Sequence, residues 1–119
     1  PLSIDGWGVV PGTLEDGRTI DVLSRSEKAP SWDRPQLISK SFSSERSQKF
    51  LSNLVTSDGE YRELYGKYLC RSFNSGRSNS IQLKDLEIFA MLQTNTLNGK
   101  TAPEKTSLWK QQCMTTEPS

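Results

Sequence analysis

A long stretch of alternating side chains, from Ile81 to Thr96, constrains the fold of this chain more than any other feature. Side chains that alternate with a period of two are typical of a β-strand, because successive residues point to opposite faces of a sheet. The two faces of the predicted strand carry Leu86, Ile88, Ala90 and Leu92 on one side and Glu87, Phe89, Met91 and Gln93 on the other. The sequence therefore predicts a long strand with at least one buried face.

Two β-hairpins are predicted, one at each end of the chain. The pair Asp16-Gly17 lies between two extended runs within residues 7–23 and favours a tight two-residue turn. Pairing outward from such a turn matches Leu14 with Thr19. In the second hairpin, Asn98-Gly99 and Pro103 predict a turn or loop, after which residues 106–113 return as a partner strand with Leu108 and Trp109. In the first hairpin, the predicted pairing places four side chains on one face of the sheet, namely Val9, Thr13, Ile20 and Val22.

Two helices are predicted between the hairpins. The first starts at a capping serine, Ser43 or Ser44, and runs to about Val55. The second is capped by Ser57 or Asp58 and ends in the Ser-, Asn- and Gly-rich residues 74–80. Apolar residues recur at helical spacing in both. The first stripe consists of Phe50, Leu51, Leu54 and Val55, and the second of Tyr61, Leu64, Tyr65, Tyr68, Leu69 and Phe73.

The order of these elements predicts an α+β fold, with an antiparallel sheet built from two β-hairpins and two central helices packed on one face. A chain of 119 residues falls within the usual size of one domain. We expect a single domain over residues 1–113 and a flexible tail over residues 114–119. Residues 24–35 are expected to form a surface loop.

The composition argues against several classes of function. A formal net charge of +1 gives no basic excess for nucleic-acid binding. No apolar run approaches the roughly 20 residues that span a bilayer, so direct membrane insertion is not expected. The chain contains no histidine, which removes the usual general base and zinc ligand. We therefore expect no enzyme activity, no catalytic residue, no metal and no cofactor.

Two local motifs carry little chemistry. Gly99-Lys100-Thr101 matches the end of a phosphate-binding loop, but Thr94 stands where the first glycine of that motif would be. A group of carboxylates could in principle do acid–base work, yet a hairpin turn and a solvated strand explain them better. These carboxylates are Asp5, Glu15, Asp16 and Asp21.

Cys70 and Cys113 are the two cysteines, and they are a possible disulfide pair. A bridge between them would close a long loop and stabilise the fold by about 3 to 4 kcal/mol in the loop-entropy model. Sequence does not show whether their Cα atoms come within bridging range, so free thiols remain the alternative. A bridged pair would favour an oxidising compartment and free thiols the cytosol.

Three residues are candidate partner-binding residues, namely Trp7, Trp32 and Arg34. A tryptophan in a polar loop beside an arginine has the composition of an interface anchor. The alternative for Trp32 is that its loop folds back over the core.

Several blocks of the chain, in the same order, resemble a known family. They run from Asp5 to Val10, from Leu14 to Val22, from Ser31 to Pro35 and from Tyr68 to Asn74, together with Glu45-Arg46, Lys49-Phe50-Leu51, Asn53-Leu54, Leu108-Trp109 and Cys113. Over residues 5–113 the chain resembles the region that follows the membrane helices in bacterial HTTM proteins, the integral membrane relatives of vitamin K-dependent γ-carboxylase. Two positions depart from the pattern. Ser47 stands where an aromatic residue is expected, and Phe73 stands where tryptophan is usual.

The resemblance implies an extramembrane C-terminal domain of a multi-span membrane protein, with Pro1 at a cut. No catalytic residue carries over, because no matching position belongs to a catalytic motif. Polar positions of the pattern, Asp16, Arg34, Arg71 and Asn74, are interpreted as turn and packing residues. The domain is then expected to associate with the membrane only through its parent chain, and to be soluble when isolated.

Two functions follow from these observations. The first is a non-enzymatic accessory domain that binds its own membrane-spanning segment or another protein, and it predicts an exposed apolar patch. The alternative is a free-standing small-ligand-binding or enzymatic domain with a cleft between sheet and helices, close to Tyr61, Tyr65 and Arg71.

Overall fold

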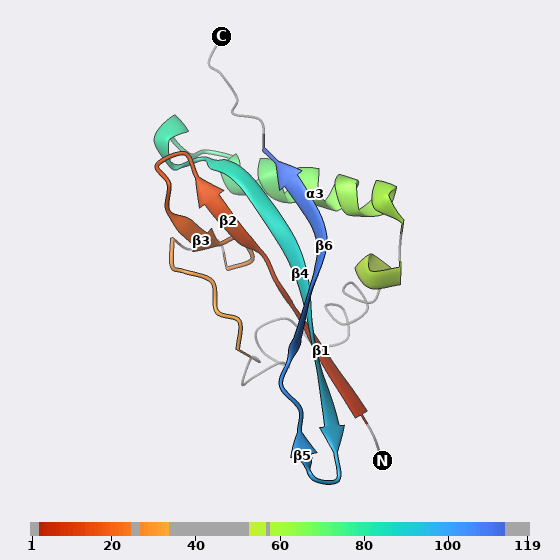
Figure 1. Ribbon diagram of the computed structural model, residues 1–119. Coiled ribbons are helices and arrows are strands. Elements are labelled where there is room, and N and C mark those ends of the chain that lie inside the picture. The colour runs from red at the N-terminus through yellow and green to blue at the C-terminus, as the bar shows by residue number, and fades with distance from the viewer. Residues whose placement is uncertain (1–2, 25–26, 34–52, 57, 114–119) are drawn as a thin grey trace.

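The computed structural model describes residues 3–24, 27–33, 53–56 and 58–113, and its central element is the strand β4 (Figure 1). β4 spans Leu83–Thr96 and confirms the predicted long strand. It begins at Leu83 because Asn79–Ile81 form a short 3-10 helix, η1, just before it. Every other described strand except β3 pairs with β4 directly, so β4 organises the whole sheet.

The sheet is antiparallel and has six strands in the described part of the chain. Along one edge of β4 lie β1 (Ser3–Val9) and then β2 (Pro11–Leu14), which pair with successive parts of the same strand. β3 (Thr19–Asp21) continues the sheet beyond β2. On the other edge, β6 (Glu104–Gln112) pairs with β4, and the short β5 (Gly99–Lys100) closes the hairpin at its end. The described chain is therefore a mixed α+β fold with an antiparallel sheet and one main helix.

The first hairpin has a different register from the predicted one. Thr13 lies opposite Thr19, one residue away from the predicted Leu14–Thr19 pair. The backbone N–H of Leu14 donates to the carbonyl of Arg18, and that of Gly17 donates to the carbonyl of Leu14, at 2.9 Å each. Gly17 has a φ of 93°, so it is the left-handed residue of a three-residue loop and not part of a two-residue turn.

The longer loop exchanges the two faces of the hairpin strand β2. A shift of one residue moves every side chain of a strand to the opposite side of the sheet. The core consequently contains Val10 and Leu14, with Leu14 fully buried, while the predicted Val9 and Thr13 point to the other face. Ile20 and Val22 of the prediction do lie in the core.

The helix α3 spans Gly59–Asn74 and lies across β4 and β6 on one face of the sheet (Figure 1). Asp58 is its N-cap, and its carboxylate accepts a hydrogen bond from the backbone N–H of Tyr61 at 3.3 Å, as expected for a capping aspartate. Residues 53–56 are also helical, whereas the rest of the first predicted helix lies outside the described residues. In the described part of the chain, no helix is long and apolar enough to cross a membrane.

The main core lies between α3 and the sheet. Asn74, at the end of α3, clamps the start of β4: the backbone N–H of Leu83 donates to its side-chain oxygen at 2.6 Å, and its amide donates back to the carbonyl of Leu83 at 3.4 Å. This contact agrees with the interpretation of Asn74 as a packing residue. The core contains Val10, Leu14, Ile20, Val22, Leu54, Leu69, Cys70, Phe73, Leu83, Leu86 and Ile88.

Candidate protein-binding surface

Helix α3 exposes large apolar side chains on the side away from the sheet. Leu64 is 62% exposed, Tyr68 55% and Tyr61 37%. Their spacing of three, four and seven residues places them on one side of a helix, where Tyr65 adjoins them. We call Tyr61, Leu64, Tyr65 and Tyr68 the aromatic strip. The inward side of the same helix buries Gly66, Leu69, Cys70 and Phe73.

Tyr65 forms the inner margin of the aromatic strip. Its ring stacks on that of Tyr68 with 6.3 Å between centroids and 17° between planes. Burial disfavours the phenolate and raises the pKa of Tyr65 to about 12, and the neighbouring Tyr68 and Tyr61 add to this increase. The strip is thus partly seated against the sheet and partly open.

Alkaline titration should detect Tyr65 directly. Its pKa in the folded protein lies above the ordinary value of 10.0, so its contribution to stability is complete below pH 10.0 and is lost as the pH rises toward about 12. We expect a late tyrosinate component in ultraviolet absorbance, and a Tyr65→Phe variant that lacks it. If the late component persists in the Tyr65→Phe variant, the assignment to Tyr65 is contradicted.

A second strip of charged residues runs beside the aromatic strip along α3. It consists of Glu60, Glu63, Lys67 and Arg71, and all four are at least partly exposed. The Nζ of Lys67 lies 3.2 Å from a carboxylate oxygen of Glu63, one helical turn away. The charge is negative in the first half of the strip and positive in the second. We call these four residues the charged strip.

The helix that carries both strips is held firmly to the sheet. Cys70 is joined by a disulfide to Cys113, just after β6, with the two Cα atoms 5.4 Å apart. One turn earlier, Gly66 packs so closely on β6 that a Cβ there would lie 3.0 Å from the Cβ of Gln111. The guanidinium of Arg62 adds hydrogen bonds to the carbonyls of Leu54 at 2.8 Å and Leu108 at 3.2 Å. These contacts fix α3 as a rigid platform.

The tryptophans predicted as partner-binding residues do not form an exposed surface. Trp7 is only 6% exposed, and its indole N–H donates to the carbonyl of Trp32 at 3.2 Å. Trp32 packs edge-to-face on Phe89 at 5.0 Å, and the Nζ of Lys105 lies 3.7 Å above its ring. The loop therefore folds back over the sheet, which was the alternative interpretation, and Arg34 lies outside the described residues.

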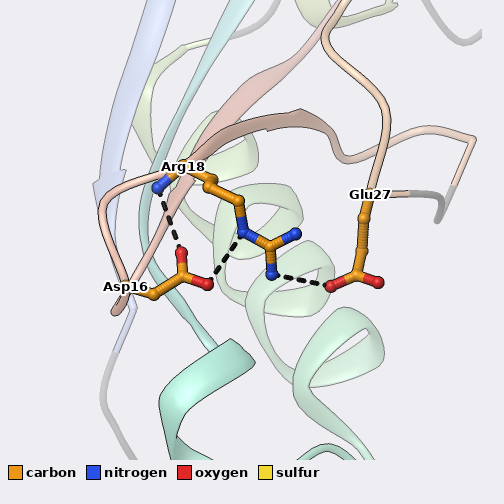
Figure 2. A network of polar contacts seen from close by, with 3 residues as sticks. All are labelled: Asp16, Arg18 and Glu27. Atoms are coloured by element: carbon orange, nitrogen blue, oxygen red, sulfur yellow. Dashed lines mark hydrogen bonds and ion pairs between the residues drawn. The ribbon is translucent and has the colours of Figure 1, made fainter.

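A polar network holds the first hairpin turn (Figure 2). The Nε of Arg18 donates to Asp16 at 2.8 Å, and its other nitrogen donates to Glu27 at 2.9 Å. The backbone N–H of Arg18 also donates to Asp16, and this bond is the largest cause that lowers the pKa of that carboxyl. The same partners, Asp16 and Glu27, raise the pKa of Arg18. Asp16 thus serves the turn, as its place in the sequence indicated.

The structure also forms an open groove of about 440 Å³ on the sheet. The alternation of β4 places Asp85 and Glu87 there, on the face opposite the core, and Ser107 donates to Glu87 at 2.6 Å. Tyr61, Tyr65 and Arg71 do not line it. The lining residues all come from β2, β4 and β6: Pro11, Thr13, Asp85, Leu86, Glu87, Lys110, Gln111 and Gln112.

Among the described residues, no group of three or more carboxylate or cysteine side chains lies close enough together to hold a metal ion. The aromatic strip of α3 is therefore the feature that best supports a function. The sequence predicts its residues as one helical stripe and places Tyr61 and Tyr65 near a possible cleft between sheet and helices, but it does not predict them as a partner-binding surface. The width of that stripe was the available signal, since one inward face cannot bury a set that wide.

No protein-family model, no curated protein and no solved structure matches this chain.

Proposed function

We propose that this chain is a non-enzymatic interaction domain that binds a protein partner through the aromatic strip of α3. The observation that supports this proposal is the exposure of Leu64 and Tyr68 on a helix bound to the sheet by a disulfide. Tyrosine is enriched at protein interfaces, because its ring buries a large area while its hydroxyl still finds a polar partner.

The rigidity of the platform favours binding. Association costs free energy for every side chain and segment that becomes ordered, and a surface that is already ordered avoids part of this cost. The stacked pair of Tyr65 and Tyr68 is ordered before any partner arrives. The strip therefore presents pre-organised aromatic area in the way that energetically important interface residues do.

The resemblance to HTTM proteins supplies the proposed context. We propose that the domain is an extramembrane accessory part of a larger HTTM-like membrane protein, and that its partner is the membrane-spanning segment of the parent chain or another protein. In this proposal the helical residues 53–56 are the end of the first predicted helix, which would pack beside α3 on the same face of the sheet.

Site-specific photo-cross-linking in the intact gene product tests the proposed function. A photoreactive phenylalanine derivative is placed at Leu64, and the matched control carries it at Leu97, which is 93% exposed at the β4–β5 turn. We expect a protein adduct from position 64 that is much weaker from position 97. Irradiation in native membranes followed by mass spectrometry identifies the adduct, and an absence of adducts from position 64 would contradict the proposal.

A further inference from the structure

We propose that the partner on α3 is a second copy of this chain, docked so that the two α3 helices run antiparallel about a two-fold axis near Leu64 and Tyr65. This inference rests on the proposed function, because it names the partner of the same surface. Its basis is the arrangement of charge and apolar area on the outward face of α3.

The outward face of α3 is divided lengthwise into two strips. At about 100° per residue, Leu64 points directly away from the buried side of Leu69 and Phe73. On one flank of Leu64 lie Tyr61, Tyr65 and Tyr68. On the other flank lie Glu60, Glu63, Lys67 and Arg71. An amphipathic surface with one apolar seam and one charged flank is the pattern by which helices pair in water.

The charged strip is self-complementary when two helices run antiparallel. Glu60 and Glu63 occupy its first half, and Lys67 and Arg71 occupy its second half. A two-fold axis at the level of residues 64 and 65 places the acidic half of one copy beside the basic half of the other. A parallel two-fold arrangement would instead place the charged strip of each copy opposite the aromatic strip of the other, where no opposite charges meet.

The symmetry also keeps the strips in matching positions. A two-fold axis perpendicular to the plane of the two helices carries the charged flank of one copy to the same side of the other copy. The aromatic strips then meet at the centre, with Tyr61 of one copy opposite Tyr68 of the other and Leu64 close to the axis. Opposed helix dipoles add a small favourable contribution. The interface is thus an apolar seam, and along one side of it the acidic half of each charged strip lies beside the basic half of the other.

The oligomeric state of the full 119-residue chain is the first test. We expect sedimentation equilibrium to show a dimer at micromolar concentrations. Leu64→Glu would place an unpaired carboxylate at the centre of the seam and should raise the dimer dissociation constant at least about thirtyfold, as for a central interface residue. Leu97→Glu adds the same charge at an exposed apolar site elsewhere, and it should leave the constant nearly unchanged.

A charge exchange tests the antiparallel geometry itself. The variant Glu60→Lys with Glu63→Lys makes the charged strip wholly basic, and Lys67→Glu with Arg71→Glu makes it wholly acidic. Each variant alone should be monomeric because like charges meet across the axis. An equimolar mixture should form a dimer that contains one chain of each kind, and this rescue excludes misfolding as the cause of the monomers.

The outcomes separate this inference from the proposed function. A chain that stays monomeric at millimolar concentration, or a dimer that neither Leu64→Glu nor the charge variants weaken, would overturn the self-association. The cross-linker at Leu64 identifies the partner. An adduct of two identical chains supports the dimer. An adduct with a different protein supports the proposed function and rejects this inference. If position 64 yields no adduct, both fail.

Discussion

Replacing Leu83 by alanine is expected to lower the free energy of unfolding by about 3 to 4 kcal/mol, in the range of fully buried leucines truncated in a packed core. Leu83 is completely buried at the first position of β4, and its backbone is clamped by Asn74. Its side chain lies so close to Gly12 that a Cβ at Gly12 would come within 2.6 Å of it. With so tight a fit, the neighbouring strands cannot easily collapse into the cavity that alanine leaves.

The matched control for this prediction is Leu97→Ala. Leu97 is 93% exposed, so the same truncation there removes almost no buried area and should change stability by less than about 0.5 kcal/mol. Urea unfolding followed by tryptophan fluorescence and circular dichroism measures both variants. Similar losses at the two positions would show that Leu83 does not occupy the core position described above.

Removal of the disulfide is expected to destabilise the fold by about 4 kcal/mol. Cys70 and Cys113 are 43 residues apart in the sequence, and a cross-link of that span restricts the unfolded chain strongly in the loop-entropy model. The bridge also joins α3 to the chain just after β6, so its loss releases the helix from one of its attachments. The double variant Cys70→Ala with Cys113→Ala should show this loss in urea unfolding.

A reductant separates the effect of the bond from that of the side chains. Reduction of the unmodified chain should cause most of the loss seen in the double variant, and the reductant should have no effect on the double variant itself. The small difference between the stability lost on reduction and the stability lost in the double variant measures the packing contribution of the buried Cys70 side chain. An unmodified chain whose unfolding is the same with and without reductant would contradict the prediction.

Local patterns were sufficient for several elements. The alternation along β4 and the helical spacing with Asp58 as a cap in α3 depend on periodicity and on short-range hydrogen bonds, which a sequence expresses directly. The two cysteines could be identified as a possible pair, but their bonding depended on a Cα separation that only the packing of α3 beside the end of β6 determines.

The first hairpin shows where local patterns were insufficient. Asp16-Gly17 fits a two-residue turn and a three-residue loop equally well, and the two differ by one residue in register. The difference is decided by burial, because the observed register places Leu14 in the core and the other places Thr13 there. A large apolar side chain gains more from burial than a threonine, so the core selected the longer loop.

The candidate surface depended on tertiary structure in the same way. Residue types and their spacing were enough to identify Trp7 and Trp32 as large rings and to place Tyr61, Leu64, Tyr65 and Tyr68 on one side of a helix. Which of these side chains the sheet covers depends on how α3 and the loop of Trp32 pack against it. β4 has two faces: α3 covers one with Leu69 and Phe73, and the loop of Trp32 covers part of the other. The aromatic strip remains exposed because a helix on a sheet can bury only the side that faces the strands.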